Sequence, residues 1–356
     1  MNFSTTRVNS SELNEDNYVS TENMLQDYQG IVDAKSVPED VNVISFSCGD
    51  ILISNIRPYL KKVWKATYNG GCSSDVFVLK ANDNIESDYL HYVIANDKFI
   101  NFVMSGAKGV KMPRGDKKQM KTYCLSLPQI QEQKKISTLL RLIDERISTQ
   151  SKIIEDLKKL KSAIIEIEYT PNAKTTSHIG DVIEQISKRN KNNAIQNVLS
   201  VSNRQGFIKQ SDQFENRNVA SEDTSNYKIV EKNDFAFNPA RINVGSIARL
   251  TTLEKGIVSP MYICFRTQEN VAPEYIDFFF ESKHFYCEIQ KRLEGSVRQC
   301  LSFEGLCNIP ISLPSLEMQQ RIGKRLLTLG QKIKTETVLL ELLNKQKQYL
   351  LRQMFI

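Results

Sequence analysis

The sequence contains one long segment twice: residues 127–169 read LPQIQEQKKISTLLRLIDERISTQSKIIEDLKKLKSAIIEIEY, and residues 313–355 read LPSLEMQQRIGKRLLTLGQKIKTETVLLELLNKQKQYLLRQMF. The two copies align without a gap at a separation of 186 residues, as Pro128 and Pro314 show. A repeat of this length indicates an internal duplication, and it decides the architecture before any local structure is considered.

Apolar residues recur in both copies at alternating spacings of four and three, which is the heptad pattern of a coiled coil. The apolar positions of the first copy are Ile136, Leu140, Ile143, Ile147, Ile154 and Leu157, and their counterparts are Ile322, Leu326, Leu329, Ile333, Leu340 and Leu343. Polar residues interrupt both seams at matching places, at Gln150 and Glu336 and again at Lys161 and Lys347. Matched interruptions of this kind commonly fix the register of paired helices.

Each copy predicts one long helix that begins near its Leu-Pro step, since proline is tolerated in the first turn of a helix. About forty residues at 1.5 Å each give a rod of roughly 60 Å, whose apolar stripe must be buried. The simplest partner for each helix is the other one. A parallel pair would crowd both globular domains at one end, so we expect an antiparallel coiled coil with one domain at each end.

The duplication predicts four segments with a mixed α/β (α+β) fold. They are a first globular domain over residues 1–127, a long helix over 128–169, a second domain over 170–313 and a second long helix over 314–356. Turns followed by short strand patterns match between residues 49–54 and 233–238. The first domain looks shortened, because residues 177–191 have no full counterpart before Arg7. Either the chain starts inside a domain or the missing strand is supplied differently.

Composition fits two folded domains. A chain of 356 residues, 40% hydrophobic and 25% charged, is long enough for each half to bury its own core. The net charge of +6 is compatible with nucleic acid and equally with an ordinary surface. The seven cysteines form no CxxC pair, which indicates reduced thiols and no zinc site. No signal-peptide profile or membrane-spanning run is present, so we expect a cytoplasmic protein.

No catalytic or cofactor motif is complete. Residues 238–241 (NPAR) lack the second proline and the aromatic residue of a methyltransferase motif, and residues 132–134 (EQK) fall where a helix start favours an acid in any case. Residues 106–118 have the wrong glycine spacing for a phosphate-binding loop, and the three histidines assemble into no triad or metal site. We therefore expect a chain without catalytic residues, bound metal or bound cofactor.

Polar and basic loops stand out in both halves. Arginine pairs with guanine, asparagine and glutamine pair with adenine, and lysine meets phosphate, so these residue types together are typical of DNA recognition, although any one such loop could equally be a solvated turn. The candidate DNA-binding residues are Ser54, Asn55, Arg57, Tyr59, Lys61, Lys62, Lys111, Arg114, Lys117 and Lys118 in the first half, and Asn203, Arg204, Gln205, Asn238, Arg241, Asn243, Arg298 and Gln299 in the second.

The chain resembles the DNA-specificity subunits of Type I restriction-modification systems over nearly its whole length. The residues that carry the resemblance are NYVSTENM (17–24), GDILISNIRPYLKKVW (49–64), GGCSSDVFVL (70–79), KGVKMPRGDKK (108–118), VLSVSNRQGFI (198–208), GIVSPMYICF (256–265), the final LLRQMF (350–355) and both Leu-Pro-led helices. Only the shortened N-terminal region departs from the pattern.

The resemblance implies two target-recognition domains, each reading half of a split DNA sequence, with the two helices as the ruler between them. It also implies double-stranded DNA and methylation subunits as partners, with two methylation subunits per chain, and restriction (translocase) subunits in the full complex. S-adenosylmethionine, ATP and Mg²⁺ would then bind to those partner subunits and not to this chain.

Two other readings remain open from the residues alone. One is an interaction scaffold that uses the coiled coil without reading DNA. The other is a nuclease or methyltransferase that acts alone, and the incomplete motifs count against it. The recurrence of polar and basic loops in both halves favours a DNA-binding function of these loops over solvated turns.

Overall fold

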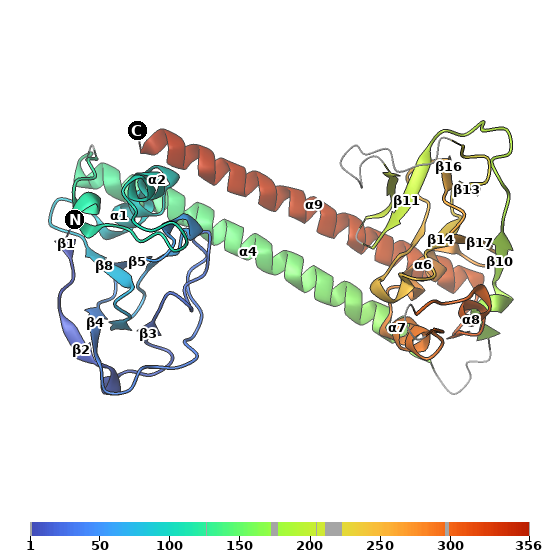
Figure 1. The fold of residues 1–356 in the computed structure, drawn as a ribbon, viewed down its shortest axis with the longest axis horizontal. Coiled ribbons are helices and arrows are strands. Elements are labelled where there is room, and N and C mark those ends of the chain that lie inside the picture. The colour runs from blue at the N-terminus through green and yellow to red at the C-terminus, as the bar shows by residue number, and fades with distance from the viewer. Residues whose placement is uncertain are drawn as a thin grey trace. The chain divides into compact units, whose positions relative to one another are not determined.

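The computed structural model describes residues 2–125, 127–171, 177–203, 205–210, 223–295 and 299–355. The chain divides into two compact units, one made of residues 1–151 with 338–356 and the other of residues 152–337. Two long helices, α4 (Ile130–Tyr169) and α9 (Leu316–Met354), therefore contribute to both units (Figure 1). In the described part of the chain, no helix is long and apolar enough to cross a membrane.

The first unit contains two four-stranded sheets. One has the strand order β1-β8-β5-β6 and the other β2-β4-β7-β3. The strands are β1 (Asn2–Phe3), β2 (Arg7–Asn9), β3 (Tyr18–Val19), β4 (Asn42–Phe46), β5 (Ile51–Ser54), β6 (Val63–Lys65), β7 (Gly70–Cys72) and β8 (Val76–Lys80). Neighbouring strands are antiparallel in both sheets except for β3 and β7, which pair in parallel.

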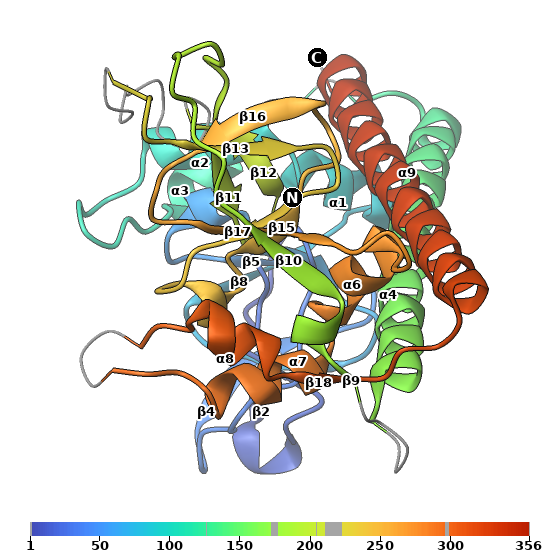
Figure 2. The same ribbon diagram turned by 90° about the vertical axis from the view of Figure 1, so that its right-hand side faces the viewer.

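The second unit has the same strand order in its first sheet, β10-β17-β14-β15, and a second sheet ordered β12-β11-β16-β13 (Figure 2). Its strands are β9 (Ser177–His178), β10 (Ile183–Ile186), β11 (Val198–Ser202), β12 (Gly206–Lys209), β13 (Lys228–Glu231), β14 (Phe235–Phe237), β15 (Ile247–Arg249), β16 (Lys255–Val258), β17 (Ile263–Thr267) and β18 (Pro310–Ile311). The pair β11 and β16 is parallel, as β3 and β7 are. The duplication is thus visible in the strand pairing as well as in the helices.

Short helices cover the sheets. They are α1 (Ser87–Ile94), α2 (Asp97–Ser105), α3 (Lys117–Lys121), α6 (Pro273–Phe279), α7 (Lys283–Gln290) and α8 (Phe303–Cys307), with single 3-10 turns η1 (Ser10–Glu12), η2 (Pro58–Leu60), η3 (Ile179–Asp181) and η4 (Ile242–Val244). The apolar stretches 87–105 and 273–290 each form two helices, because a polar side chain caps the second one. Asn96 accepts a hydrogen bond from the backbone N–H of Lys98, and Ser282 accepts one from that of Phe285.

A buried glutamine fixes the start of each long helix to its domain. The side chain of Gln133 in α4 accepts from the backbone N–H of Glu86 and donates to the carbonyl oxygens of Asn84 and Pro128. Gln319 in α9 accepts from the N–H of Ala272 and donates to the oxygen of Pro314. The two glutamines occupy equivalent positions of the repeat, so the same clamp was duplicated with the helix.

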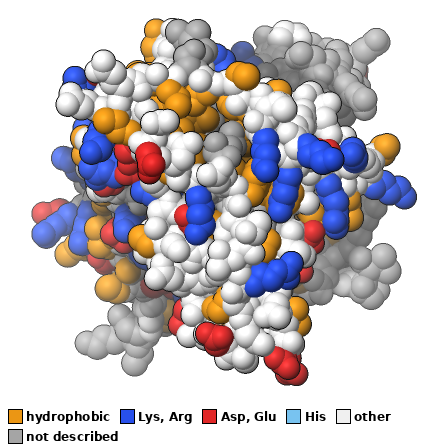
Figure 3. Space-filling model, turned by 90° about the vertical axis from the view of Figure 1, so that its left-hand side faces the viewer, with side chains coloured by type: hydrophobic (Ala, Val, Ile, Leu, Met, Phe, Trp, Pro, Cys, Tyr) orange, Lys and Arg blue, Asp and Glu red, His pale blue; other side chains and the backbone are white. Residues whose placement is uncertain are grey.

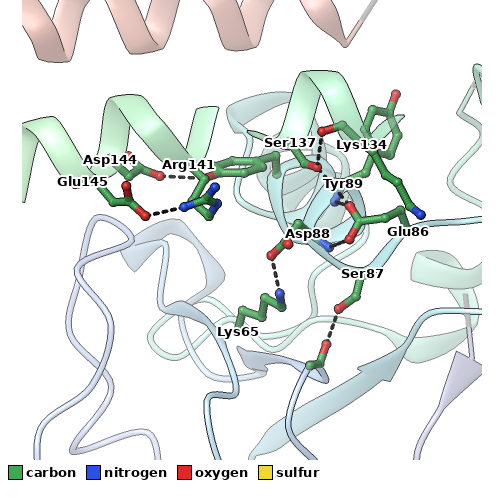
Figure 4. Close-up of polar contacts among 12 residues, drawn as sticks. Lys65, Glu86, Ser87, Asp88, Tyr89, Lys134, Ser137, Arg141, Asp144 and Glu145 are labelled. Carbon is green, nitrogen blue, oxygen red and sulfur yellow. Dashed lines mark hydrogen bonds and ion pairs between the residues drawn. The ribbon is translucent and has the colours of Figure 1, made fainter. Parts of the chain in front are cut away.

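Around the first clamp, further polar contacts join α4 to α1 (Figure 4). The carboxylate of Glu86 caps α1 and also accepts a hydrogen bond from the hydroxyl of Ser137 at 3.0 Å. Asp88, in the first turn of α1, pairs with Lys65 of β6. The second unit repeats that ion pair, because Arg249 of β15 contacts Glu274 at 2.6 Å.

The far end of each long helix also packs into a domain core. Tyr169 at the end of α4 lies 4.7 Å from the ring of Tyr275 in the second unit, and Phe355 after α9 lies 5.2 Å from Tyr89 in the first. These pairs are again equivalent in the repeat. Because α4 begins and α9 ends in the first unit, the first core contains both Leu140 and Phe355.

The lysines that interrupt the heptad seams have aromatic partners at equivalent positions of the repeat and acidic partners at different positions. Lys161 pairs with Glu281 at 2.7 Å and lies over the ring of Phe278, whereas Lys347 pairs with Asp144 at 2.6 Å and lies over Tyr92. The predicted apolar seam positions are all buried or half-buried. Lys161 thus pairs with an acidic residue of the second domain, whereas Lys347 pairs with a residue of the other long helix.

Candidate nucleic-acid interface

Two candidate loops of the first domain meet at one place. The turn after β5, residues 55–57, and a hairpin of residues 108–114 lie side by side, since Ile56 and Arg114 form an antiparallel bridge. The N–H of Arg57 donates to the oxygen of Pro113 at 2.8 Å, and that of Gly115 donates to the oxygen of Asn55 at 3.1 Å. We call these segments the first turn and the first hairpin. Their pairing brings together residues more than fifty positions apart in sequence.

The first turn holds an arginine in an unusual backbone conformation. Arg57 has a φ of 51° and Lys61, at the other end of η2, has a φ of 54°, both in the left-handed region that non-glycine residues rarely adopt. Such conformations persist only where surrounding contacts fix them, and they gather at functional sites. The arginine side chain is exposed. The turn thus presents a free guanidinium on a fixed backbone.

Beside it, Arg114 and Asn55 complete a polar cluster. The Arg114 guanidinium lies 3.4 Å from the Asp75 carboxylate and its side chain is still 55% exposed, so it can contact a further partner. The Oδ1 atom of Asn55 is buried without a hydrogen-bond partner among the described residues. Unsatisfied buried acceptors of this kind are uncommon and need an explanation.

The remaining candidates of the first domain have contacts within the domain. Ser54 is buried, and its hydroxyl donates to the oxygen of Ile56 at 2.9 Å, which stabilises the first turn. Lys61 pairs with Asp97 at 2.8 Å, and Lys62 Nζ donates to the oxygen of Thr21. Lys117 lies over the ring of Phe77 at 4.7 Å. The exposed residues of this group are Tyr59, Lys111, Lys117 and Lys118.

The basic segment at 111–118 is only partly a loop. Lys117 and Lys118 begin the short helix α3, which is capped by Asp116, whose carboxylate accepts from the N–H of Lys118 at 2.7 Å. This contact and an ion pair with Lys108 hold the pKa of Asp116 below its usual range. The aspartate therefore stays charged and rigidifies the base of the first hairpin.

The second domain places its candidates at the same edge of the equivalent sheet. Residues 238–243 follow β14 as residues 55–57 follow β5, and the N–H of Leu301 donates to the oxygen of Pro239 as that of Gly115 does to Asn55. Arg241 is exposed, and Asn238 and Asn243 are half-buried. Asn203 and Gln205 follow β11 and line a hollow of about 570 Å³ that also contains Arg249 and Asp277.

Burial and pairing explain the charges in that hollow. Arg249 is buried and its guanidinium contacts both Glu274 and Asp277. Burial raises the pKa of Asp277, while the arginine opposes the rise. Asn203 and Gln205 are exposed at this hollow, together with Thr251, Thr252 and Glu281.

In the segment 294–300, Glu294 and Cys300 are joined by two backbone hydrogen bonds, as Lys108 and Arg114 are in the first hairpin. Gln299 in it is exposed. The candidates Arg204 and Arg298 lie outside the described residues. The two segments therefore have the same closing pair and differ in charge, since residues 108–114 contain three basic residues and residues 294–300 contain one acidic and one basic residue.

Sequence reasoning missed a basic hollow and several exposed apolar residues. Lys188, Arg189, Lys191 and Lys255 line a hollow of about 840 Å³ in the second domain. The run of basic and amide residues from 188 to 193 was the available signal. Exposed apolar side chains beside the candidate loops are Val110, Met112, Val244 and Met261. On the face drawn in Figure 3, Lys and Arg side chains gather over one area, with hydrophobic side chains between them.

Comparison with known proteins identifies the family. The model of the Type I restriction modification DNA specificity domain matches residues 4–159 and 171–345. The Type I restriction enzyme MjaVIII specificity subunit of Methanocaldococcus jannaschii is 26% identical over 311 residues, which are 78% of this chain and 72% of that protein. The chain therefore belongs to the Type I restriction-modification DNA specificity family. It is a specificity subunit, which is a non-catalytic component.

Solved structures agree on the fold. The Type I restriction-modification S subunit from M. genitalium has a TM-score of 0.57 at 15% identity, covering 100% of this chain and 96% of that one. A second match comes from a structure that describes the assembly and conformational transition of a type I restriction-modification system. Its TM-score is also 0.57, at 16% identity, and the match covers 99% of this chain and 94% of that one. The mixed helix-and-sheet fold predicted from the sequence is thereby confirmed.

Proposed function

We propose that this specificity subunit recognises a bipartite DNA target, with residues 1–127 reading one half-site and residues 170–313 the other. The observation that carries the proposal is that the two domains repeat one topology but have different side chains in the equivalent turns at the edge of the sheet. Where the first domain presents Asn55 and Arg57, the second presents Pro239 and Arg241. Two readers with one fold and different loops suit a target whose halves differ in sequence.

Exposure divides the candidates into base readers and supports. Arg57 and Arg114 in the first domain, and Arg241 in the second, are exposed and held by the backbone, so they suit bidentate contacts with guanine. Asn203, Gln205 and Gln299 suit adenine. Exposed lysines such as Lys111 and Lys118 suit phosphate, and buried Ser54 supports the turn.

The two long helices act in this proposal as an antiparallel coiled coil that sets the spacing between half-sites. Support comes from the unit boundaries, since the first unit takes the start of α4 together with the end of α9. Inside that unit, Asp144 of α4 pairs with Lys347 of α9. A register fixed by specific polar pairs is what a ruler requires.

Methylation subunits are the proposed protein partners, two per chain, because the long helix is present in two copies. Apolar side chains remain exposed on the helices: Leu139, Leu142, Val338, Leu342 and Tyr349 in the first unit, and Ile153, Leu160, Ile167 and Leu327 in the second. Exposed apolar residues in such numbers mark interaction surfaces. Restriction (translocase) subunits would join through the methylation subunits.

S-adenosylmethionine, ATP and Mg²⁺ are proposed to bind those partners, and no cofactor is assigned to this chain. Acting on chromosomal DNA, the complex would work in the cytoplasm. A gel-shift experiment tests the proposal. It measures binding of the chain, assembled with its methylation subunits, to random and to genomic duplexes. We expect a sequence preference that survives competitor DNA. Binding without any preference would instead support a scaffold that does not read DNA.

A further inference from the structure

We propose that the first hairpin carries an apolar wedge, made of Val110 and Met112, that inserts between base pairs of the first half-site and bends the duplex. This inference rests on the proposed function and adds a mode of recognition to it: DNA distortion in addition to base-edge contacts. It concerns one domain only, and its residues all lie within residues 55–116.

The tip of the hairpin is apolar where a solvated loop would be polar. The side chain of Val110 is 100% exposed and that of Met112 is 47% exposed. A single exposed apolar residue is ordinary on protein surfaces. Two of them at the end of one short hairpin, with no described side chain covering the valine, form a small apolar point that water contacts at a cost.

Cations rim this point. Lys108 is 82% exposed and Arg114 is 55% exposed at the base of the hairpin, and Lys111 lies exposed between the two apolar residues. Proteins that kink DNA place apolar side chains in the base stack while basic residues meet the phosphates on either side. A docking surface for an apolar protein partner would not require three cations around so small a tip.

The hairpin is also held firmly enough to act as a wedge. Two backbone hydrogen bonds of 3.0 and 2.9 Å join Lys108 and Arg114, and the buried Pro113 accepts a third from Arg57. Gly109 has a φ of +95°, and a Cβ atom there would lie 3.2 Å from the oxygen of Met112. Unstacking a base step costs a few kcal/mol, so a wedge needs a rigid base.

The position of the first hairpin links bending of the DNA to contacts with base edges. The bonds from Arg57 and Gly115 attach it to the first turn, beside Arg57 and Asn55. A bend at the wedge would turn the neighbouring base edges towards these side chains. Sequence preference would then arise partly from how easily a step unstacks, because flexible pyrimidine–purine steps deform at the lowest cost.

The test uses the chain assembled with its methylation subunits, bound to duplexes of the recognised sequence. Each duplex carries 2-aminopurine at a different single position of the first half-site. This base fluoresces when it leaves the stack. We expect a several-fold rise at one step for the unmodified chain, and loss of that rise in a Val110→Ser, Met112→Gln double variant. Both side chains are exposed, so the variant should fold, and circular dichroism melting checks this.

A matched control is Val41→Ser, which removes another exposed valine of the same domain, 48% exposed and away from both candidate loops. It should keep the fluorescence rise. A methylation subunit that flips its target adenine would produce its own signal at that base. That signal should persist in the double variant, which separates flipping from wedging.

No rise beyond the flipped base, in a complex that still prefers its target, would overturn the wedge and leave the proposed function intact. A second result would also overturn the wedge. If replacing thymine by deoxyuridine weakened DNA binding as much as the double variant does, and no base unstacked, Val110 would be contacting a thymine methyl group. A wild-type complex with no sequence preference would instead overturn the proposed function.

Discussion

Among the proposed base-reading residues, Arg57 has an unusual backbone conformation that its neighbours fix. Its left-handed backbone is fixed on one side by η2 and on the other by the bond from its N–H to Pro113. The side chain has no such restraint and stays exposed. A fixed backbone with a free guanidinium lowers the entropy lost when the arginine meets a base.

Substituting this arginine should change half of the specificity. We expect Arg57→Ala or Arg114→Ala to weaken binding by roughly 1 to 3 kcal/mol and to relax the first half-site only, because a bidentate base contact is lost. Arg241→Ala is the matched control, and should relax the second half-site only. Binding selections on randomised duplexes measure both. A uniform loss with a shallower salt dependence would make these residues phosphate contacts instead.

A second residue-scale prediction concerns pH. Burial lowers the pKa of His91 to about 4, and its Nδ1 atom is buried without a hydrogen-bond partner among the described residues. The unfolded chain, with a histidine pKa near 6.5, then binds more protons than the folded chain between these values. Stability from this group is therefore complete above about pH 6.5 and falls as the pH drops towards 4.

We expect a slope of up to about 1.4 kcal/mol per pH unit in that window. Urea unfolding at several pH values measures it. His91→Leu should flatten the dependence of the free energy of unfolding on pH, whereas substitution of the exposed His178 should leave this dependence unchanged. An unchanged slope in His91→Leu would show that other groups cause the acid sensitivity.

At the scale of elements, the repeat was predictable and its contacts were not. Heptad spacing is a local property, so α4 and α9 could be read directly from the sequence. The matched lysines of the seams predict polar contacts between the helices, which the structure shows for Lys347 but, among the described residues, not for Lys161. In the structure Lys161 contacts Glu281 and Phe278, and Lys347 contacts Tyr92 as well as Asp144. Such partners are more than a hundred residues away and leave no local pattern.

Short strands were equally hidden. The strands β3 and β1 contain two residues each, too few to show alternation. The break between α1 and α2 did carry a signal, since Asn96 is a favoured capping residue. The candidate turns were readable by composition, but their meeting depends on the Arg57 and Gly115 backbone bonds, which composition cannot reveal.

The glutamine clamp gives an element-scale prediction. Gln133→Leu should leave the N–H of Glu86 and the oxygens of Asn84 and Pro128 unpaired, at about 1 to 3 kcal/mol for each group that water cannot reach. We therefore expect a loss of roughly 2 kcal/mol or more in the free energy of unfolding. Gln131→Leu, at an exposed position two residues earlier in the same helix, is the control. If denaturant melts showed similar stability for both variants, the hydrogen bonds of Gln133 would not stabilise the fold.

At the scale of the whole molecule, the proposed division of labour is a ruler with two readers. Adding one heptad at equivalent places in α4 and α9 should lengthen the ruler by about 10 Å, or about three base pairs of rise. The expected result is a longer spacer with both half-site sequences intact. Binding selection on duplexes with variable spacers measures it. Altered half-site sequences would contradict the ruler.

The central claim is that this one chain dictates both halves of a split target, and genome-wide mapping of methylated adenines tests it most directly. The comparison is between the host strain, a strain lacking this gene, and a strain carrying Arg57→Ala. We predict one bipartite methylated motif that disappears without the gene and loses stringency in its first half with the variant. A motif that survives deletion of the gene, or that is continuous, would contradict the account.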